Sequence, residues 1–160
     1  MDSEGANVHR VAALMGAGLV LALPVFSQQD FSGKWEFNPA KSQNIGMMAE
    51  MKLIATVKQT AQELAVTNVT TFNGREQSSE TRLDLTGKPV RNKNPMEAMA
   101  ETVTKWNGKL MVTTWTSPGS VAGTASIRTE TRSLSADGHT MTIESRRGKQ
   151  PAMVMVYDRK

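Results

Sequence analysis

The chain has 160 residues, of which 39% are hydrophobic and 21% charged, the length and composition of one globular domain rather than a disordered chain. It contains no cysteine, which excludes a disulfide scaffold, a thiol nucleophile and a zinc site built on cysteine. The formal net charge is +4, the basic residues are spread along the chain, and only 5% of residues are aromatic. A nucleic-acid-binding surface usually needs a basic patch with interleaved aromatic side chains, so we expect no nucleic acid partner.

The first 27 residues have the layout of an export signal. Residues 11–23 carry no charge; this run is shorter than the ~20 residues that span a bilayer but fits the apolar core of a signal peptide. Pro24 then ends a helix, and we place cleavage after Ser27. The sequence therefore predicts a signal peptide (a helix) over 1–27 and one domain over 28–160, exported to the periplasm or secreted, with no stable membrane span after processing. Asp2 and Glu4 offset the positive charge usual at the start of a signal, and a buried N-terminal helix is the alternative.

Short strands separated by turn signals are predicted for the rest of the chain. The strongest alternation lies between residues 51 and 59, where apolar side chains face one way and lysines and a threonine the other. Residues 39–50 are predicted to hold a helical turn, 86–95 and 117–123 are predicted loops, and 96–106 is ambiguous between helix and strand. The predicted strands are, in chain order, 33–37, 51–59, 63–72, 75–85, 109–116, 124–134, 140–146 and 153–158.

The turns between these strands are tight. Asn73-Gly74, Asn107-Gly108 and Asp137-Gly138 are dipeptides typical of two-residue hairpins, because both positions accept positive φ. Such short connections exclude parallel crossovers. We therefore predict an all-β fold: an antiparallel up-and-down barrel of about eight to ten strands, since an open sheet would leave free edges.

The opening Phe31-Ser32-Gly33-Lys34-Trp35 resembles the G-x-W signature at the first strand of lipocalins and related calycin barrels. The resemblance implies a lipocalin-like barrel in which Trp35 plugs one end beneath a basic residue of the last strand. Arg159 is the matching residue here, so Gly33, Trp35 and Arg159 are the expected structural closure. Residues 33–42 and 132–144 are also similar to segments of small exported bacterial proteins of lipocalin-like type, whose function is largely uncharacterised.

Residues that could support catalysis are few. His139 is the only histidine after the predicted signal, and it follows a predicted hairpin turn, where a solvated side chain is the ordinary role. Glu76, Glu80 and Asp84 share one face of a strand, which indicates solvent-facing charges more than a carboxylate pair. No nucleotide-binding or nucleophile motif occurs. We expect no enzyme activity, no metal site and no cofactor.

Two features of the sequence leave alternatives open. Residues 126–132 alternate so that Ser126, Arg128, Glu130 and Arg132 share one face while Ile127 and two threonines share the other. The arginines could line the barrel interior and meet a ligand anion, but we favour a solvated exterior, because burying three charges requires full pairing. The methionines around 47–51 and 96–99 could form a lid over the barrel or simply pack in the core.

The leading functional hypothesis is an extracytoplasmic binding protein for a small apolar or amphipathic molecule. Ligand pockets are mainly apolar with a few placed polar groups. The alternative is a barrel filled by its own side chains that acts through protein contacts, such as an envelope factor or a protease inhibitor; the oligomeric state is left open. Candidate ligand contacts, assigned by strand position, are Trp106, Trp115, Met99, Met111, Arg128, Arg132 and Tyr157.

Overall fold

The computed structural model describes residues 28–94 and 98–160. The predicted signal peptide and Met96 lie outside these residues. Two short 3-10 helices follow the first strand: η1 (Pro39–Lys41) and η2 (Gly46–Glu50). The strands are β1 (Gly33–Phe37), β2 (Lys52–Gln59), β3 (Glu63–Phe72), β4 (Arg75–Asp84), β5 (Val90–Lys93), β6 (Met99–Asn107), β7 (Leu110–Pro118), β8 (Ala125–Leu134), β9 (Thr140–Arg147) and β10 (Met153–Arg159).

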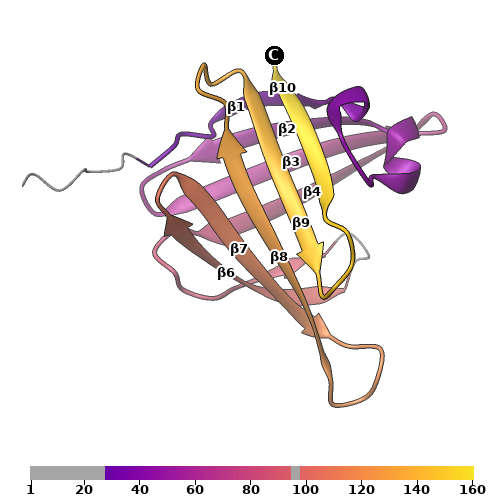
Figure 1. The fold of residues 1–160 in the computed structure, drawn as a ribbon, viewed down its shortest axis with the longest axis vertical. Helices are drawn as coiled ribbons and strands as arrows, with labels where there is room; N and C mark the ends of the chain where they lie inside the picture. The colour runs from indigo at the N-terminus through magenta and orange to yellow at the C-terminus, as the bar shows by residue number, and fades with distance from the viewer. Residues whose placement is uncertain (1–27, 95–97) are drawn as a thin grey trace, which may run out of the picture.

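These strands form a single 10-stranded antiparallel sheet in the order β4-β3-β2-β1-β10-β9-β8-β7-β6-β5. Strands adjacent in sequence pair with each other, except β4 and β5, which are the two edges of the sheet, and β1 pairs with β10. The sheet curls round on itself, with β1–β4 behind β6–β10 in the view of Figure 1. The predicted all-β, up-and-down barrel is confirmed.

Two segments differ from the prediction. The predicted loop 86–95 contains β5, and the ambiguous segment 96–106 contains the strand β6. Neither strand could be recognised in the sequence, because inward-facing positions in both are polar. Asn92 in β5 and Thr102 and Thr104 in β6 are all buried. Apolar alternation identifies a strand only where the buried face is apolar.

The barrel is nearly closed between β4 and β5, and the side chain of Asn92 joins these two strands. Its Nδ2 donates to the backbone oxygen of Arg82 at 2.8 Å, and its Oδ1 accepts from the Arg82 amide at 3.0 Å. The same Nδ2 also donates to Thr102 Oγ1 at 2.8 Å. One carboxamide thus takes the place of a backbone partner that β5 does not offer β4 here.

One end of the barrel is sealed by aromatic side chains. Trp35 is fully buried, its Nε1 donates to the Phe31 carbonyl at 2.9 Å, and the guanidinium of Arg159 lies 4.2 Å from its ring centre. Arg159 also donates to the carbonyls of Ser32 and Gly138, both at 2.9 Å. A Cβ on Gly33 would lie 2.6 Å from Arg159 Nη1, so the close approach requires glycine. This end is called the closed end below.

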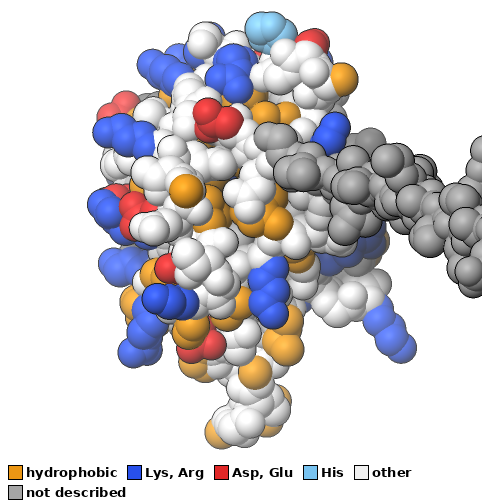
Figure 2. All heavy atoms as spheres, turned by 90° about the vertical axis from the view of Figure 1, so that its left-hand side faces the viewer, with side chains coloured by type: hydrophobic (Ala, Val, Ile, Leu, Met, Phe, Trp, Pro, Cys, Tyr) orange, Lys and Arg blue, Asp and Glu red, His pale blue; other side chains and the backbone are white. Residues whose placement is uncertain are grey.

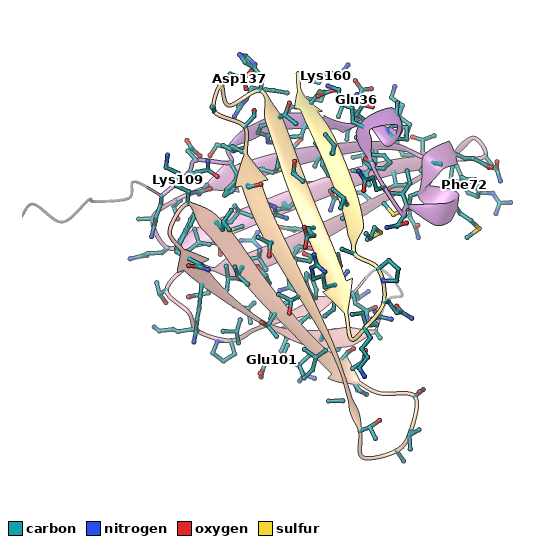
Figure 3. All side chains as sticks on the ribbon, viewed as in Figure 1. Glu36, Phe72, Glu101, Lys109, Asp137 and Lys160 are labelled. Atoms are coloured by element: carbon teal, nitrogen blue, oxygen red, sulfur yellow. The ribbon has the colours of Figure 1, made fainter. Side chains whose placement is uncertain are left out.

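The opposite end of the barrel, called the mouth below, carries η1, η2 and the connections that follow β3, β7 and β9. In Figure 3, Lys109 and Asp137 mark turns at the closed end, while Phe72 and Glu101 lie toward the mouth. The η2 segment packs Met48 and the preceding Ile45 against the core, whereas Met47 is 76% exposed.

The outer surface is mixed in charge. Figure 2 shows lysine and arginine side chains spread over one face with acidic side chains between them. Within residues 28–94 and 98–160, no helix is both long and apolar enough to cross a membrane.

Candidate functional site

The charged face of β8 lines the barrel interior. The side chains of Arg128 and Glu130 are each 13% exposed, whereas Ile127, on the other face, is 56% exposed. The favoured sequence interpretation, a solvated exterior for Ser126 to Arg132, is therefore wrong. Burial is tolerated for two of the three charges because Arg128 Nη1 lies 3.1 Å from Glu130 Oε1. Arg128 also stacks on the ring of Trp115, 4.7 Å from its centre.

Arg132 is the third buried charge, and it is much less well satisfied. It is 9% exposed, and its Nε and Nη1 have no hydrogen-bond partner in the part of the chain that the structure describes. Its guanidinium lies 6.0 Å from the ring centre of Phe31. Burial lowers the pKa of Arg132, and the neighbouring Glu130 and Tyr157 act in the opposite direction. A buried cation with unused donors is a site that an acidic group would stabilise.

Tyr157 lies on β10 within the electrostatic range of Arg132. Burial raises the pKa of its hydroxyl to about 12, despite the opposing influence of Arg132. Its hydroxyl donates to the sulfur of Met155 at 3.8 Å, a weak partner. The phenol therefore stays neutral at physiological pH and can donate to an anion bound beside Arg132.

The interior has one polar and one apolar wall. On β6, β7 and β9 the buried positions include hydroxyl side chains, and Thr104 and Thr113 hydrogen-bond to each other at 2.9 Å. The β1–β3 side is lined by Phe37, Leu53, Val57 and other apolar residues of the core. An interior of this kind suits a molecule that is itself part polar and part apolar.

The structure brings six of the seven candidate contacts to the interior face. In the β-sheet register Trp106 pairs with Met111, Met111 with Arg132, and Trp115 with Arg128. Tyr157 faces inward from β10 and is 4% exposed. Met99 does not join them: it is 43% exposed, and it precedes the buried Ala100, so alternation turns it outward.

A small cavity lies inside the barrel near its mouth. It measures about 80 Å³ and is lined by Trp115, Ser117, Arg128 and Arg147 among others. Pockets for drug-sized ligands measure ~300–1,000 Å³, so a larger ligand has to displace side chains. The core supplies movable ones, because Met111, Met141 and Met155 are all buried and methionine is flexible.

Sequence reasoning missed Phe31 and Arg147. Phe31 is fully buried, stacks on Trp106 with ring centres 6.1 Å apart, and belongs to an N-terminal segment that crosses the closed end. No strand pattern precedes β1, so only the apolar character of Phe31 beside polar neighbours could have indicated it. Arg147 lies opposite Arg128 in the pairing of β8 with β9. The Asp137-Gly138 turn and the alternation along β9 together could have indicated this position from sequence.

Metal binding finds no support in the described ranges, where no three His, Cys, Asp or Glu side chains gather in reach of one ion. His139 is exposed beside its turn, and Glu76 and Glu80 are exposed on β4. The chemistry available inside the barrel is therefore that of cationic and hydroxyl donors next to apolar surface.

No family model and no curated protein matches this sequence. Solved structures of similar fold do match. One titled REP1-NXSQ fatty acid transporter has a TM-score of 0.63 at 15% identity and covers 81% of this chain and 95% of its own. The Echinococcus granulosus fatty-acid-binding protein 1 gives 0.63 at 13% identity, with coverage of 81% and 96%. Human cRBP IV gives 0.59 at 13% identity, with coverage of 82% and 99%.

At these identities the likeness concerns the fold alone. The chain has the fold of the calycin β-barrels.

Proposed function

We propose that this protein binds a small amphipathic acid inside its barrel, with the acidic group on Arg132 and the apolar part against the methionine-rich core. The observation that carries the proposal is the buried guanidinium of Arg132, whose Nε and Nη1 lack a partner among the described residues. Tyr157 provides a second, neutral donor nearby. The proposed role is binding without catalysis.

The charge inside the barrel favours an acid over a neutral or basic ligand. Arg128, Arg132 and Arg147 share the inward-facing positions of β8 and β9, and Glu130 is the one carboxylate set between them. Glu130 forms its ion pair with Arg128 and compensates the charge of Arg132 only in part. Solved structures of similar fold include proteins titled as a fatty acid transporter and a fatty-acid-binding protein, which supports this class of ligand.

Calorimetric titration with decanoate tests the proposal. We expect saturable binding by the wild-type chain and a loss of about tenfold to a hundredfold in affinity for Arg132→Met, since hydrogen bonds to charged groups contribute ~1.5–3 kcal/mol. Arg146→Met is the matched control, because Arg146 faces outward next to Glu144 and should leave affinity unchanged. Equal affinity in wild type and Arg132→Met would refute the assignment of the site.

Extracytoplasmic location is a second part of the proposal. It rests on the uncharged run 11–23 followed by Pro24, typical of a cleaved signal. N-terminal sequencing of the protein recovered from its producing cells checks it. A mature chain beginning at Gln28 is the expected result, and an intact N-terminus at Met1 would contradict it.

An interaction role is the second candidate, and the β7–β8 hairpin favours it. Val121 is 65% exposed on a connection without charged residues, and Ile127 is 56% exposed beyond it. A groove of about 580 Å³ runs beside them, lined by Met99, Pro118 and Ala125 among others. Absence of decanoate binding together with loss of partner binding on Val121→Ser would favour this role over the first.

A further inference from the structure

The cavity near the mouth is small, about 80 Å³, and carries polar side chains in its lining. Trp115, Ser117, Ser126, Arg128 and Arg147 contribute to this lining, together with Asn94 and Ala100. A carboxylate, a phosphate or a sulfate group is small enough for such a space.

Two guanidinium groups face this cavity from neighbouring strands. Arg128 of β8 and Arg147 of β9 are directly opposite in the register, an arrangement of like charges that is unfavourable unless it is compensated. Glu130 compensates Arg128 through the 3.1 Å ion pair. Arg147 is exposed to solvent and makes no side-chain hydrogen bond or ion pair with any residue that the structure describes, so its guanidinium is available to a ligand in the cavity.

Neutral donors complete the lining. The indole Nε1 of Trp115 is buried and has no hydrogen-bond partner within the described residues, although Trp115 is only 7% exposed. Ser117 and Ser126 lie opposite each other in the register of β7 and β8 and bring two hydroxyls to the same cavity. An oxyanion accepts hydrogen bonds from all of these groups and neutralises the charge of Arg147.

We propose that this cavity is a binding site for one oxyanion, held between Arg128 and Arg147 with the Trp115 indole as a third donor. The site is separate from the one at Arg132, since Arg128 lies four residues away on β8, roughly 13 Å along the strand. Its ligand is either a free oxyanion or the phosphate, sulfate or carboxylate group of a larger molecule that enters at the mouth.

Proton–nitrogen NMR correlation spectra of the protein, titrated with inorganic phosphate at constant ionic strength, test the proposal. We expect a saturable shift of the Trp115 indole N–H, while the Trp35 indole, already bonded to the Phe31 carbonyl, serves as an internal reference. Arg147→Met should lower the affinity for inorganic phosphate by about tenfold or more, because it removes a charged hydrogen-bond donor. Arg146→Met makes the same substitution at the neighbouring, outward-facing arginine and should leave the phosphate titration as in wild type.

The outcomes separate cleanly. No saturable shift at Trp115, or an equal loss in Arg146→Met and Arg147→Met, overturns the proposal, the latter because it would indicate general attraction to a basic surface. Decyl phosphate, followed at the Trp115 indole of Arg132→Met, distinguishes the source: tighter binding than inorganic phosphate indicates a head group, and equal binding indicates a free ion. Arg132→Met should leave the phosphate titration unchanged, so failure of the decanoate site and failure of this site are distinguishable.

Discussion

At the scale of single residues, the buried charge of Arg132 destabilises the folded protein but can bind an acidic ligand. Its guanidinium is buried, its pKa is lowered by that burial, and two of its nitrogens lack acceptors among the described residues. A buried charge that is only partly paired destabilises a folded chain relative to an apolar side chain of similar shape. Binding sites often keep such groups because a ligand supplies the missing partner.

This argument predicts that Arg132→Met stabilises the protein in the absence of ligand. Methionine keeps much of the apolar stem and removes the desolvated charge, so the free energy of unfolding should rise by about 1–2 kcal/mol. Urea denaturation of both proteins gives the measurement. A lower free energy of unfolding for Arg132→Met would mean that Glu130 and Phe31 satisfy the arginine, and the binding argument would lose its basis.

The burial of Tyr157 predicts how the stability of the protein changes at alkaline pH. Its pKa is raised by burial from 10.0 to about 12, so the folded protein resists ionisation of the phenol more than the unfolded chain does. This contribution to stability is fully present below pH 10 and is lost as the pH rises toward 12. Because Tyr157 is the only tyrosine, phenolate absorbance reports this group alone.

The phenolate signal should therefore develop near pH 12 in the folded protein and near pH 10 after denaturation in urea. Tyr157→Phe should remove the loss of stability that this ionisation causes. A phenolate signal near pH 10 from the folded protein would show that the hydroxyl is solvated and not placed in the interior.

At the scale of elements, the junction between β4 and β5 depends on one side chain. Asn92 supplies both a donor and an acceptor to Arg82 and a further donor to Thr102. Elsewhere the pairing of adjacent strands is made by the backbone itself. The contact between β4 and β5 can therefore be tested by substituting Asn92.

Asn92→Leu should destabilise the protein by about 2–4 kcal/mol, because it leaves the Arg82 amide and carbonyl without these partners and removes one of the two hydrogen bonds of the Thr102 hydroxyl. Native-state hydrogen exchange should show faster exchange of the Arg82 amide in the variant. Arg91→Ala, an exposed neighbour on β5, is the control and should change neither quantity. Unchanged exchange at Arg82 would indicate that backbone packing alone closes the barrel.

The same junction explains which strands could be predicted from sequence. The strand β2 follows from apolar alternation, and the hairpins β3–β4, β6–β7 and β8–β9 follow from their Asn-Gly and Asp-Gly turns. The strand β5 has a buried asparagine in place of an apolar residue, and β6 buries two threonines. A polar residue on the inner face reverses the pattern on which such prediction rests, since its hydrogen-bond partners come from other strands.

At the scale of the whole molecule, the barrel joins a polar wall to an apolar one. Trp106, Trp115, Met111 and Tyr157 face inward, as their strand positions predicted. The inward turn of Arg128, Glu130 and Arg132 could not be predicted, because it depends on partners distant in sequence: Trp115 on β7 and Phe31 before β1. The cavity beside Arg147 depends in the same way on residues of four strands, β6, β7, β8 and β9.

The central claim is that an acidic group binds inside the barrel at Arg132. NMR of decanoate isotopically labelled at its carboxyl carbon tests it most directly, because the carboxyl resonance reports its own surroundings. The wild-type protein and Arg146→Met should each give a bound resonance distinct from free decanoate, and Arg132→Met should not. A bound resonance that is unchanged in Arg132→Met, or no bound resonance in any of the three proteins, would contradict the account.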